Sequence, residues 1–265
     1  MEPGAHPTRQ SGHQPDHHQL EQPKRPAEET DGPSRKIEAN VMIVGPSRTA
    51  ALGIFTAMLL DLANQIITTP GRREIYTSPP FSIMDFLGTD ESRVFTDAAM
   101  SLPLPVKSER ATDTAMTTLT DFEYELTHRD VGADSQLPAK FLFLCGLQAA
   151  HGVRSQGSYA EPGLNPNASK FMRLLREGAS RSLFTIIWCN SFSNIELTMA
   201  DGIDSFDHLI VLGGLNQYPA RLTGIGNETV AQSWYANRRD NTTVPIIPFA
   251  MPAETWCDNV VRTFR

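Results

Sequence analysis

Short apolar runs alternate along the chain with segments in which apolar residues recur every three or four positions. The first run, Asn-Val-Met-Ile-Val-Gly at residues 40–45, is followed by Pro46 and predicts a buried strand that enters a tight loop. Residues 51–65 carry a single apolar stripe and predict a helix. That stripe consists of Leu52, Phe55, Leu59 and Leu62. A strand, a short loop with a glycine and an amphipathic helix form the opening of an α/β unit.

The same alternation continues along the rest of the chain. We expect further strands at residues 81–86, 104–107, 140–145, 183–189, 208–212 and 244–249. We expect further helices at residues 91–101, 111–129, 167–178 and 193–200, and a last helix from residue 254. Strands separated by helices imply a mostly parallel sheet with helices on both faces. The predicted fold class is therefore α/β, with a central sheet flanked by helices and one core.

The first 36 residues differ in composition from the rest of the chain. They hold six of the 19 prolines, four of the seven histidines and no aromatic residue. Their Leu, Ile, Val and Met content is limited to Met1 and Leu20. A segment of this kind buries too little apolar surface to offset the entropy lost on ordering. We therefore expect a disordered Pro/His-rich tail at residues 1–36 and a single domain at residues 37–265.

The net charge argues against a chain that binds nucleic acid by itself. The chain carries −7 in total, and residues 1–36 account for −1 with five Lys or Arg against six Asp or Glu, which leaves −6 for the remainder. Affinity for a phosphate backbone comes mainly from clustered Lys and Arg. We therefore expect contact with DNA only as part of a larger assembly.

Cysteine spacing and hydropathy favour a cytoplasmic protein. Cys145, Cys189 and Cys257 lie far apart, so we expect buried thiols rather than disulfides or zinc ligands. The histidines of the tail lack cysteine partners and a fixed geometry, and we expect no metal site. No apolar run approaches the roughly 18 residues of a membrane span, and the N-terminus lacks the apolar region of a signal peptide. We expect no membrane insertion.

The loop after the first strand stands where a phosphate-binding loop would lie. Against the pattern G-x-x-x-x-G-K-[ST], Gly45 matches the first glycine, whereas Ala50 replaces the second. Ala51 stands at the lysine position and Leu52 at the hydroxyl position. Without the lysine and the hydroxyl, the loop lacks the charge compensation and the metal ligand that phosphoryl transfer needs.

Backbone N–H groups at the start of the predicted helix still offer a site for an anion. The candidate nucleotide-binding residues are Gly45, Ser47, Arg48, Thr49, Ala50 and Ala51. The candidate cofactor is ATP, bound weakly, with Arg48 as the cation that assists. The competing interpretation is an ordinary strand-to-helix turn, which nearly every α/β domain contains.

Three polar residues at predicted strand ends are candidates for chemistry. Asp85 would hold magnesium in place of a missing acid, or it would form a turn before Gly88. Gln148 follows the most apolar strand, where an ATPase has its acid, and would order a water or remain solvated. Asn190 follows the next predicted strand and would contact a bound phosphate or cap a helix.

One long stretch resembles a known family. Residues 171–192 read Phe-Met-Arg-Leu-Leu-Arg-Glu-Gly-Ala-Ser-Arg-Ser-Leu-Phe-Thr-Ile-Ile-Trp-Cys-Asn-Ser-Phe. This stretch resembles the helix and sensor strand of FtsK/SpoIIIE-type motor domains, which are hexameric RecA-like ATPases that pump double-stranded DNA. It is most similar to a divergent branch with Leu-Arg-Glu-Gly before an apolar strand that ends in Trp-Cys-Asp or a near variant. The resemblance extends to residues 41–65, with Ala-Ala-Leu-Gly at residues 50–53, and to residues 140–148 and 208–215.

The resemblance covers residues 40–250 and implies a RecA-like P-loop fold with degenerate Walker A and Walker B motifs. By this resemblance, Cys145 and Gly146 stand at the acidic Walker B pair, and Asn190 stands at the sensor glutamine. The DNA-tracking loops and the winged-helix domain of such motors have no recognisable counterpart in the sequence.

These departures lead to one hypothesis and two alternatives. The hypothesis is a RecA-like domain that does not hydrolyse ATP and has a structural or regulatory role beside an active motor, another protein partner or copies of itself. The first alternative is an active, unconventional ATPase and double-stranded DNA translocase, in which Arg48 replaces the lysine and Asp85 holds magnesium. The second alternative is a small-molecule-binding α/β domain unrelated to motors.

Overall fold

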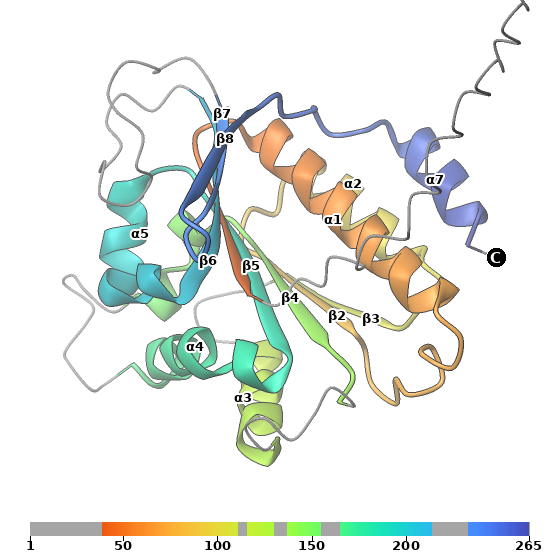
Figure 1. Cartoon of the computed structure of the whole chain (residues 1–265), viewed down its shortest axis with the longest axis horizontal. Helices are drawn as coiled ribbons and strands as arrows, with labels where there is room; N and C mark the ends of the chain where they lie inside the picture. Colours follow the sequence, from red (N-terminus) through yellow and green to blue (C-terminus); the bar gives the residue numbers. More distant parts are fainter. Residues whose placement is uncertain (1–38, 111–115, 130–136, 155–164, 214–232, 265) are drawn as a thin grey trace, which may run out of the picture. The chain divides into compact units, whose positions relative to one another are not determined.

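A single mixed sheet runs through the computed structural model, which describes residues 39–110, 116–129, 137–154, 165–213 and 233–264. Within these ranges the strand order is β3-β2-β4-β5-β1-β6-β7-β8 (Figure 1). The strands are β1 Asn40–Val44, β2 Phe81–Asp85, β3 Val106–Arg110, β4 Lys140–Cys145, β5 Leu183–Cys189, β6 Phe206–Val211, β7 Ser233–Asn237 and β8 Thr242–Ile246. The strands β1 to β6 pair in parallel, whereas β7 pairs antiparallel with both β6 and β8.

Helices cover both faces of this sheet and make a three-layer α/β fold (Figure 1). The helices are α1 Arg48–Thr68, α2 Asp90–Met100, α3 Thr117–His128, α4 Pro166–Glu177, α5 Phe192–Met199 and α7 Glu254–Arg262. One buried cluster joins the sheet to α1, α2 and α7, and a second joins the opposite face to α3, α4 and α5. The expected α/β class, with a mostly parallel central sheet flanked by helices, is confirmed.

The central strands match the prediction most closely. β4 and β5 have the predicted bounds, and every residue of each is buried. Strands of this kind lie between two layers of helices and are apolar on both faces, so their composition alone marks them. The three cysteines are buried free thiols, as the sequence predicts.

The C-terminal part of the sheet corrects the prediction. The strand expected at residues 244–249 lies at Thr242–Ile246, and β7 at Ser233–Asn237 was not predicted. The two form an antiparallel hairpin, with Asn241 in the left-handed conformation at φ 51° in the turn. β8 lies at the sheet edge and is mostly exposed, so neither strand has the continuous apolar run that marks a central strand.

Other element boundaries differ by a few residues. α1 begins at Arg48 rather than at residue 51, and β3 spans Val106–Arg110 rather than residues 104–107. β3 is the other edge strand, which allows charged residues to continue it. α3 begins at Thr117, and residues 111–115 of the predicted helix lie outside the described residues. The predicted tail at residues 1–36 also lies outside them.

The α1 helix corrects the expectation that no apolar run approaches a membrane span. It has 21 residues, and among the described helices it is the one long and apolar enough, by length and composition alone, to cross a membrane. The structure buries 67% of its most apolar window inside the protein. Phe55 and Leu59 are completely buried in the core against the sheet, so packing accounts for the apolar character of this helix.

Candidate functional site

The loop after β1 is short and held in place by its neighbours. The amide of Gly45 donates to the carbonyl of Cys189 at 3.0 Å, and the indole Nε1 of Trp188 donates to the carbonyl of Gly45 at 3.0 Å. Gly45 has φ 144°, and a Cβ there would lie 2.6 Å from the Cβ of Leu212. A glycine is therefore required for close packing against Leu212, the residue after β6, whether or not the loop binds a ligand.

The α1 helix begins before a phosphate cradle can form. Ser47 is its N-cap residue, with an Oγ that accepts a hydrogen bond from the amide of Ala50 at 3.4 Å. Its carbonyl accepts from the amide of Ala51 at 3.1 Å. Arg48 and Thr49 are already in the first turn, so only residues 45–47 separate the strand from the helix. The Ser47 side chain thus takes up one of the helix-start amides that would otherwise bind an anion.

The positions of the missing lysine and hydroxyl face the core. Ala51 and Leu52 are both 0% exposed and belong to the cluster between α1 and the sheet. A side chain at either position points away from solvent. These two positions therefore differ from a phosphate loop in the direction of the side chain as well as in residue type. Cys145, at the Walker B position of the resemblance, is also completely buried. This burial raises the pKa of its thiol well above the ordinary value, with a further contribution from Asp85.

Arg48 is engaged with the neighbouring helix α2. Its Nη1 lies 3.4 Å from Oε2 of Glu91, and the two side chains are 42% and 47% exposed. The pKa of Glu91 is lowered, first by a hydrogen bond from its own backbone amide and then by the Thr89 side chain, with a smaller contribution from Arg48. The ion pair is exposed and weak, so Arg48 retains freedom to move.

Asp85 serves as a hydrogen-bond acceptor in the turn that follows β2. Its Oδ1 accepts from the amides of Leu87 at 2.9 Å and Gly88 at 3.2 Å. Its Oδ2 accepts from the hydroxyl of Ser92 at 2.8 Å, inside the capping box at the start of α2. Asp85 as a whole is 8% exposed. These contacts are those of the turn residue that the second interpretation of the sequence describes.

Gln148 and Asn190 are brought together at the carboxyl ends of β4 and β5. Oε1 of Gln148 accepts from the amide of Asn190 at 3.2 Å, across 42 positions of sequence. Oδ1 of Asn190 in turn accepts from Nδ2 of Asn194 at 2.8 Å. Sequence reasoning missed Asn194 and also Arg154, whose Nη2 donates to the carbonyl of Gln148 at 3.1 Å. No local pattern links these four residues.

Each candidate carboxylate or amide at this edge of the sheet therefore has a partner within the fold. Among the described residues, no group of three or more His, Cys, Asp or Glu could hold a metal ion. Burial raises the pKa of the nearby Cys189 thiol to about 11, which leaves it protonated and a poor metal ligand at neutral pH. The residues present do not fit a magnesium nucleotide held in the manner of a phosphate loop.

No protein family model matches the chain by sequence, and no curated protein matches it. Several solved structures do match it by fold. EssC (ATPases 2 and 3) from Geobacillus thermodenitrificans superposes with a TM-score of 0.57 and 13% identity, over 86% of this chain and 44% of that chain. The cytoplasmic domain of the type VII secretion ATPase EccC from Thermomonospora curvata has a TM-score of 0.53 and 13% identity, over 85% of this chain and 28% of that chain.

Two smaller solved structures are similar as well. The pCW3 conjugation coupling protein TcpA has a TM-score of 0.54 and 10% identity, over 86% of this chain and 65% of that chain. The genome packaging NTPase B204 from Sulfolobus turreted icosahedral virus 2 has a TM-score of 0.50 and 12% identity, over 81% of this chain and 100% of that chain. The structural neighbours are FtsK/SpoIIIE-like P-loop ATPases, and the fold of this chain is theirs. It spans less than half of EssC and of EccC.

Proposed function

We propose that this chain is a non-hydrolysing RecA-like domain that acts through binding to other proteins. One observation carries the proposal: α1 begins directly after Ser47, with its end capped by that side chain, and the lysine and hydroxyl positions are buried Ala51 and Leu52. Phosphoryl transfer needs a cation on the transferred phosphate and a held metal ion. Neither the loop nor the enclosed Cys145 supplies them.

The bonding of the remaining candidates supports the same conclusion. Both carboxylate oxygens of Asp85 accept hydrogen bonds from the turn and from α2. The Gln148 side chain accepts from the backbone amide of Asn190. The alternative ATPase would have to withdraw Asp85 from three hydrogen bonds and Arg48 from Glu91 before either could reach a nucleotide. Weak binding of ATP at residues 45–51 then depends on first-turn amides and on Arg48 alone.

The proposed partner is an active motor subunit, another protein or a second copy of this chain. A RecA-like domain presents the same outer surfaces whether or not its nucleotide loop functions, so loss of hydrolysis leaves docking intact. We propose that residues 37–265 make up this domain and residues 1–36 a tail outside its core, in a cytoplasmic protein. DNA contact, at a net charge of −7, would come through the assembly.

The proposal is tested by turnover and binding in parallel. The chain is assayed with ATP and magnesium, with and without double-stranded DNA, while its melting temperature is followed with ATP, a non-hydrolysable analogue and an unrelated nucleotide. We expect no turnover above background in either condition. Mass measurement in solution shows whether the chain self-associates.

Two arginine variants distinguish weak ATP binding without hydrolysis from an active ATPase. Arg48→Ala removes the one cation at the loop, and Arg93→Ala, which removes an exposed cation on α2 that pairs with Asp90 at 3.3 Å, is the matched control. A small ATP-dependent rise in melting temperature that Arg48→Ala removes and Arg93→Ala retains would indicate weak binding without hydrolysis. Magnesium-dependent turnover that is lost in Arg48→Ala or in Asp85→Ala would overturn the proposal in favour of the ATPase.

A further inference from the structure

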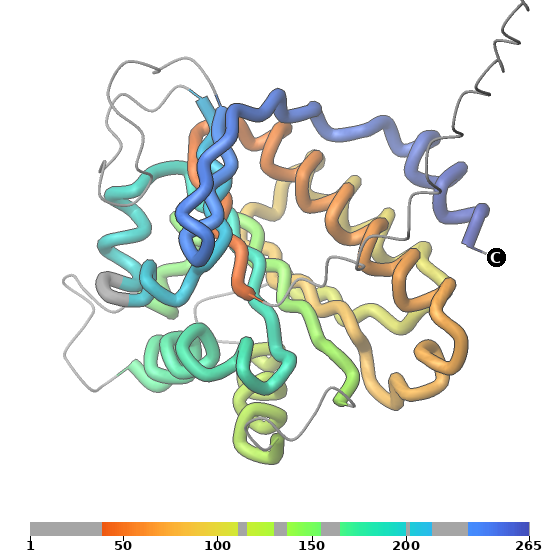
Figure 2. The backbone as a smooth tube through the Cα atoms, viewed as in Figure 1, coloured from red at the N-terminus to blue at the C-terminus, as the bar shows by residue number. Residues whose placement is uncertain are grey.

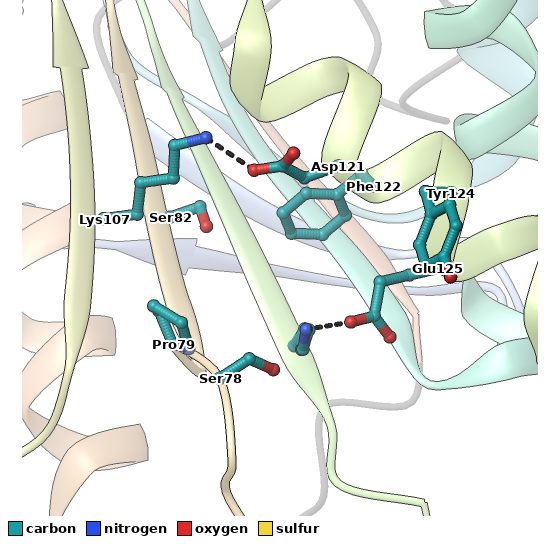
Figure 3. A pocket seen from close by; sticks show the side chains of 9 residues that line it. Ser78, Pro79, Ser82, Lys107, Asp121, Phe122, Tyr124 and Glu125 are labelled. Atoms are coloured by element: carbon teal, nitrogen blue, oxygen red, sulfur yellow. Dashed lines mark hydrogen bonds and ion pairs between the residues drawn. The ribbon is translucent and has the colours of Figure 1, made fainter.

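A cavity of 230 Å³ lies between the sheet and α3 (Figure 3). Its strand side includes Ser82 of β2, Lys107 of β3 and Lys140 of β4, and its helix side includes Asp121, Phe122 and Glu125. Lys140 is the first residue of β4, and Ser82 and Lys107 are the second residues of their strands. The cavity is therefore at the amino ends of these parallel strands, and the candidate nucleotide loop is at the carboxyl end of β1.

The cavity is lined by a buried cation, Lys140, that has more N–H donors than hydrogen-bond partners among the described residues. The Lys140 side chain is 9% exposed, and its Nζ donates to Oε1 of Glu125. Oε2 of the same carboxylate accepts from Nε of Arg129 at 3.0 Å. Two cations thus share one carboxylate. An ammonium has three N–H donors, and within the described residues Glu125 is the one hydrogen-bond partner of Lys140 Nζ.

The rest of the wall offers a hydroxyl and an apolar surface. Ser82 is 6% exposed, and its hydroxyl makes no hydrogen bond to another described residue. Phe122 is 3% exposed and presents its ring beside the two ion pairs (Figure 3). On the far side Lys107 is satisfied, since its Nζ lies 2.5 Å from Oδ2 of Asp121 and 3.2 Å from Oγ1 of Thr117. The positive charge to be neutralised is therefore at Lys140.

We propose that this cavity binds a small organic carboxylate, with its oxygens on Lys140 Nζ and Ser82 Oγ and its apolar part against Phe122. Lys140 Nζ has N–H donors beyond the one that Glu125 accepts, the Ser82 side chain also lines the cavity, and a carboxylate could accept from the ammonium and the hydroxyl together. Arg129 shares Glu125 with Lys140 from outside the lining, so three cations stand against the two carboxylates Glu125 and Asp121; one negative charge balances that excess, whereas a phosphate dianion exceeds it. The volume equals that of roughly eight waters at about 30 Å³ each, which is the size of a compact acid.

Benzoate is the probe, because it joins one carboxylate to a planar ring. It is titrated into the full chain labelled with ¹⁵N, and amide shifts are followed by NMR beside the melting temperature; benzamide, the neutral isostere, and inorganic phosphate are titrated in the same way. We expect saturable shifts around residues 78–82, 121–125 and 140 with benzoate, and none that saturate with benzamide or phosphate. This cavity is independent of the nucleotide loop, so the result does not depend on the proposed function.

Variants assign the contacts. Lys140→Met should weaken benzoate binding at least about tenfold, and Ser82→Ala by about threefold, because a charged hydrogen bond contributes more than a neutral one. Lys170→Met is the control, since Lys170 lies on α4 and pairs with Glu123 at 3.3 Å outside the cavity. Ser82→Ala removes a single oxygen and retains the fold, so it remains decisive if Lys140→Met does not fold. Equal affinity for benzoate and benzamide, unchanged affinity in Ser82→Ala, or no saturation by benzoate would overturn the proposal.

Discussion

Individual polar side chains at the strand ends have a local structural task. Ser47 caps α1, and Asp85 accepts from two turn amides and from Ser92 in the capping box of α2. Serine and aspartate are common both at helix starts and in catalytic sites, because the same oxygen that accepts an amide can bind a metal or a phosphate. Whether such an oxygen caps a helix or binds a ligand depends on which donors the fold places beside it.

Asp85→Ala should therefore lower stability. The change removes the acceptor of the Leu87 and Gly88 amides and leaves the Ser92 hydroxyl with the carbonyl of Thr89 at 2.9 Å, and we expect a loss of about 1–3 kcal/mol in the free energy of unfolding. Denaturant titration measures it. Asp61→Ala is the control, because Asp61 is exposed and accepts only from Gln65 at 2.9 Å within the described residues. A loss no larger than that of Asp61→Ala would show that the carboxylate is free for another role.

Elements are tied together by side chains that cross from one to the next. α3 has Met116 at its N-cap position, which offers no side-chain hydrogen bond. The carboxylate of Glu109, from the edge strand β3, accepts instead from the amides of Thr117 at 3.1 Å and Thr118 at 2.9 Å. The start of α3 is thus determined by a residue of another element, and through α3 so is one wall of the cavity.

This contact predicts a pH dependence. Burial raises the pKa of Glu109, but hydrogen bonds from Thr118 and Thr117 outweigh it, so the pKa lies below its ordinary value. A lowered folded-state pKa contributes stability above the unfolded value of about 4.3, and this contribution is lost as the pH falls. Glu109→Gln should cost about 1 kcal/mol at pH 7, and the difference from the unaltered chain should shrink below about pH 4.

Denaturant midpoints between pH 7 and pH 3 give the comparison. Glu196→Gln, at an exposed position on α5, serves as the control and should leave the midpoint unchanged at each pH. A constant difference between Glu109→Gln and the unaltered chain across this range would contradict the assignment.

At the scale of the whole domain, the C-terminal segment covers α1. It passes from β8 over the first turns of α1 to α7 (Figure 2). Gly53 of α1 makes the crossing close, since a Cβ there would lie 2.7 Å from the carbonyl oxygen of Phe249 and 2.8 Å from the carbonyl carbon of Ala250. Beyond it, α7 adds Val261 to the core on the α1 face. The apolar helix α1 is thus covered by the sheet on one side and by this segment on the other.

Gly53→Ala should destabilise the fold even though alanine is the better helix former. Helix propensity would favour alanine by about 1 kcal/mol, whereas contact with backbone atoms costs about 1–3 kcal/mol, so we expect a net loss of about 1 kcal/mol. Thermal unfolding measures it, with Asn64→Ala at an exposed position of the same helix as the control. A gain as large as that of Asn64→Ala would show that the segment does not pack against α1 at this point.

The sequence predicted the elements whose character is local. β4 and β5 have the predicted bounds because each is an apolar run with a single polar residue, Lys140 in β4 and Thr185 in β5. β7 was missed because only two of its five residues are buried, and its pairing with β6 and β8 supplies the remaining stability. Asn241 in the turn between β7 and β8 was the signal that would have revealed the hairpin.

The candidate site divides in the same way. The missing lysine, hydroxyl and acid can be read from residue types, and they stand at Ala51, Leu52 and Cys145. The early start of α1, the engagement of Asp85 and the contact between Gln148 and Asn190 arise from contacts that no local pattern encodes.

Composition and periodicity describe the free energy of each segment alone, and they specify an α/β fold without the usual phosphate-binding residues. Strand order, the covering of α1 and the pairing of Lys140 with Glu125 depend on distances between segments far apart in the chain, which exist only once the sheet has formed.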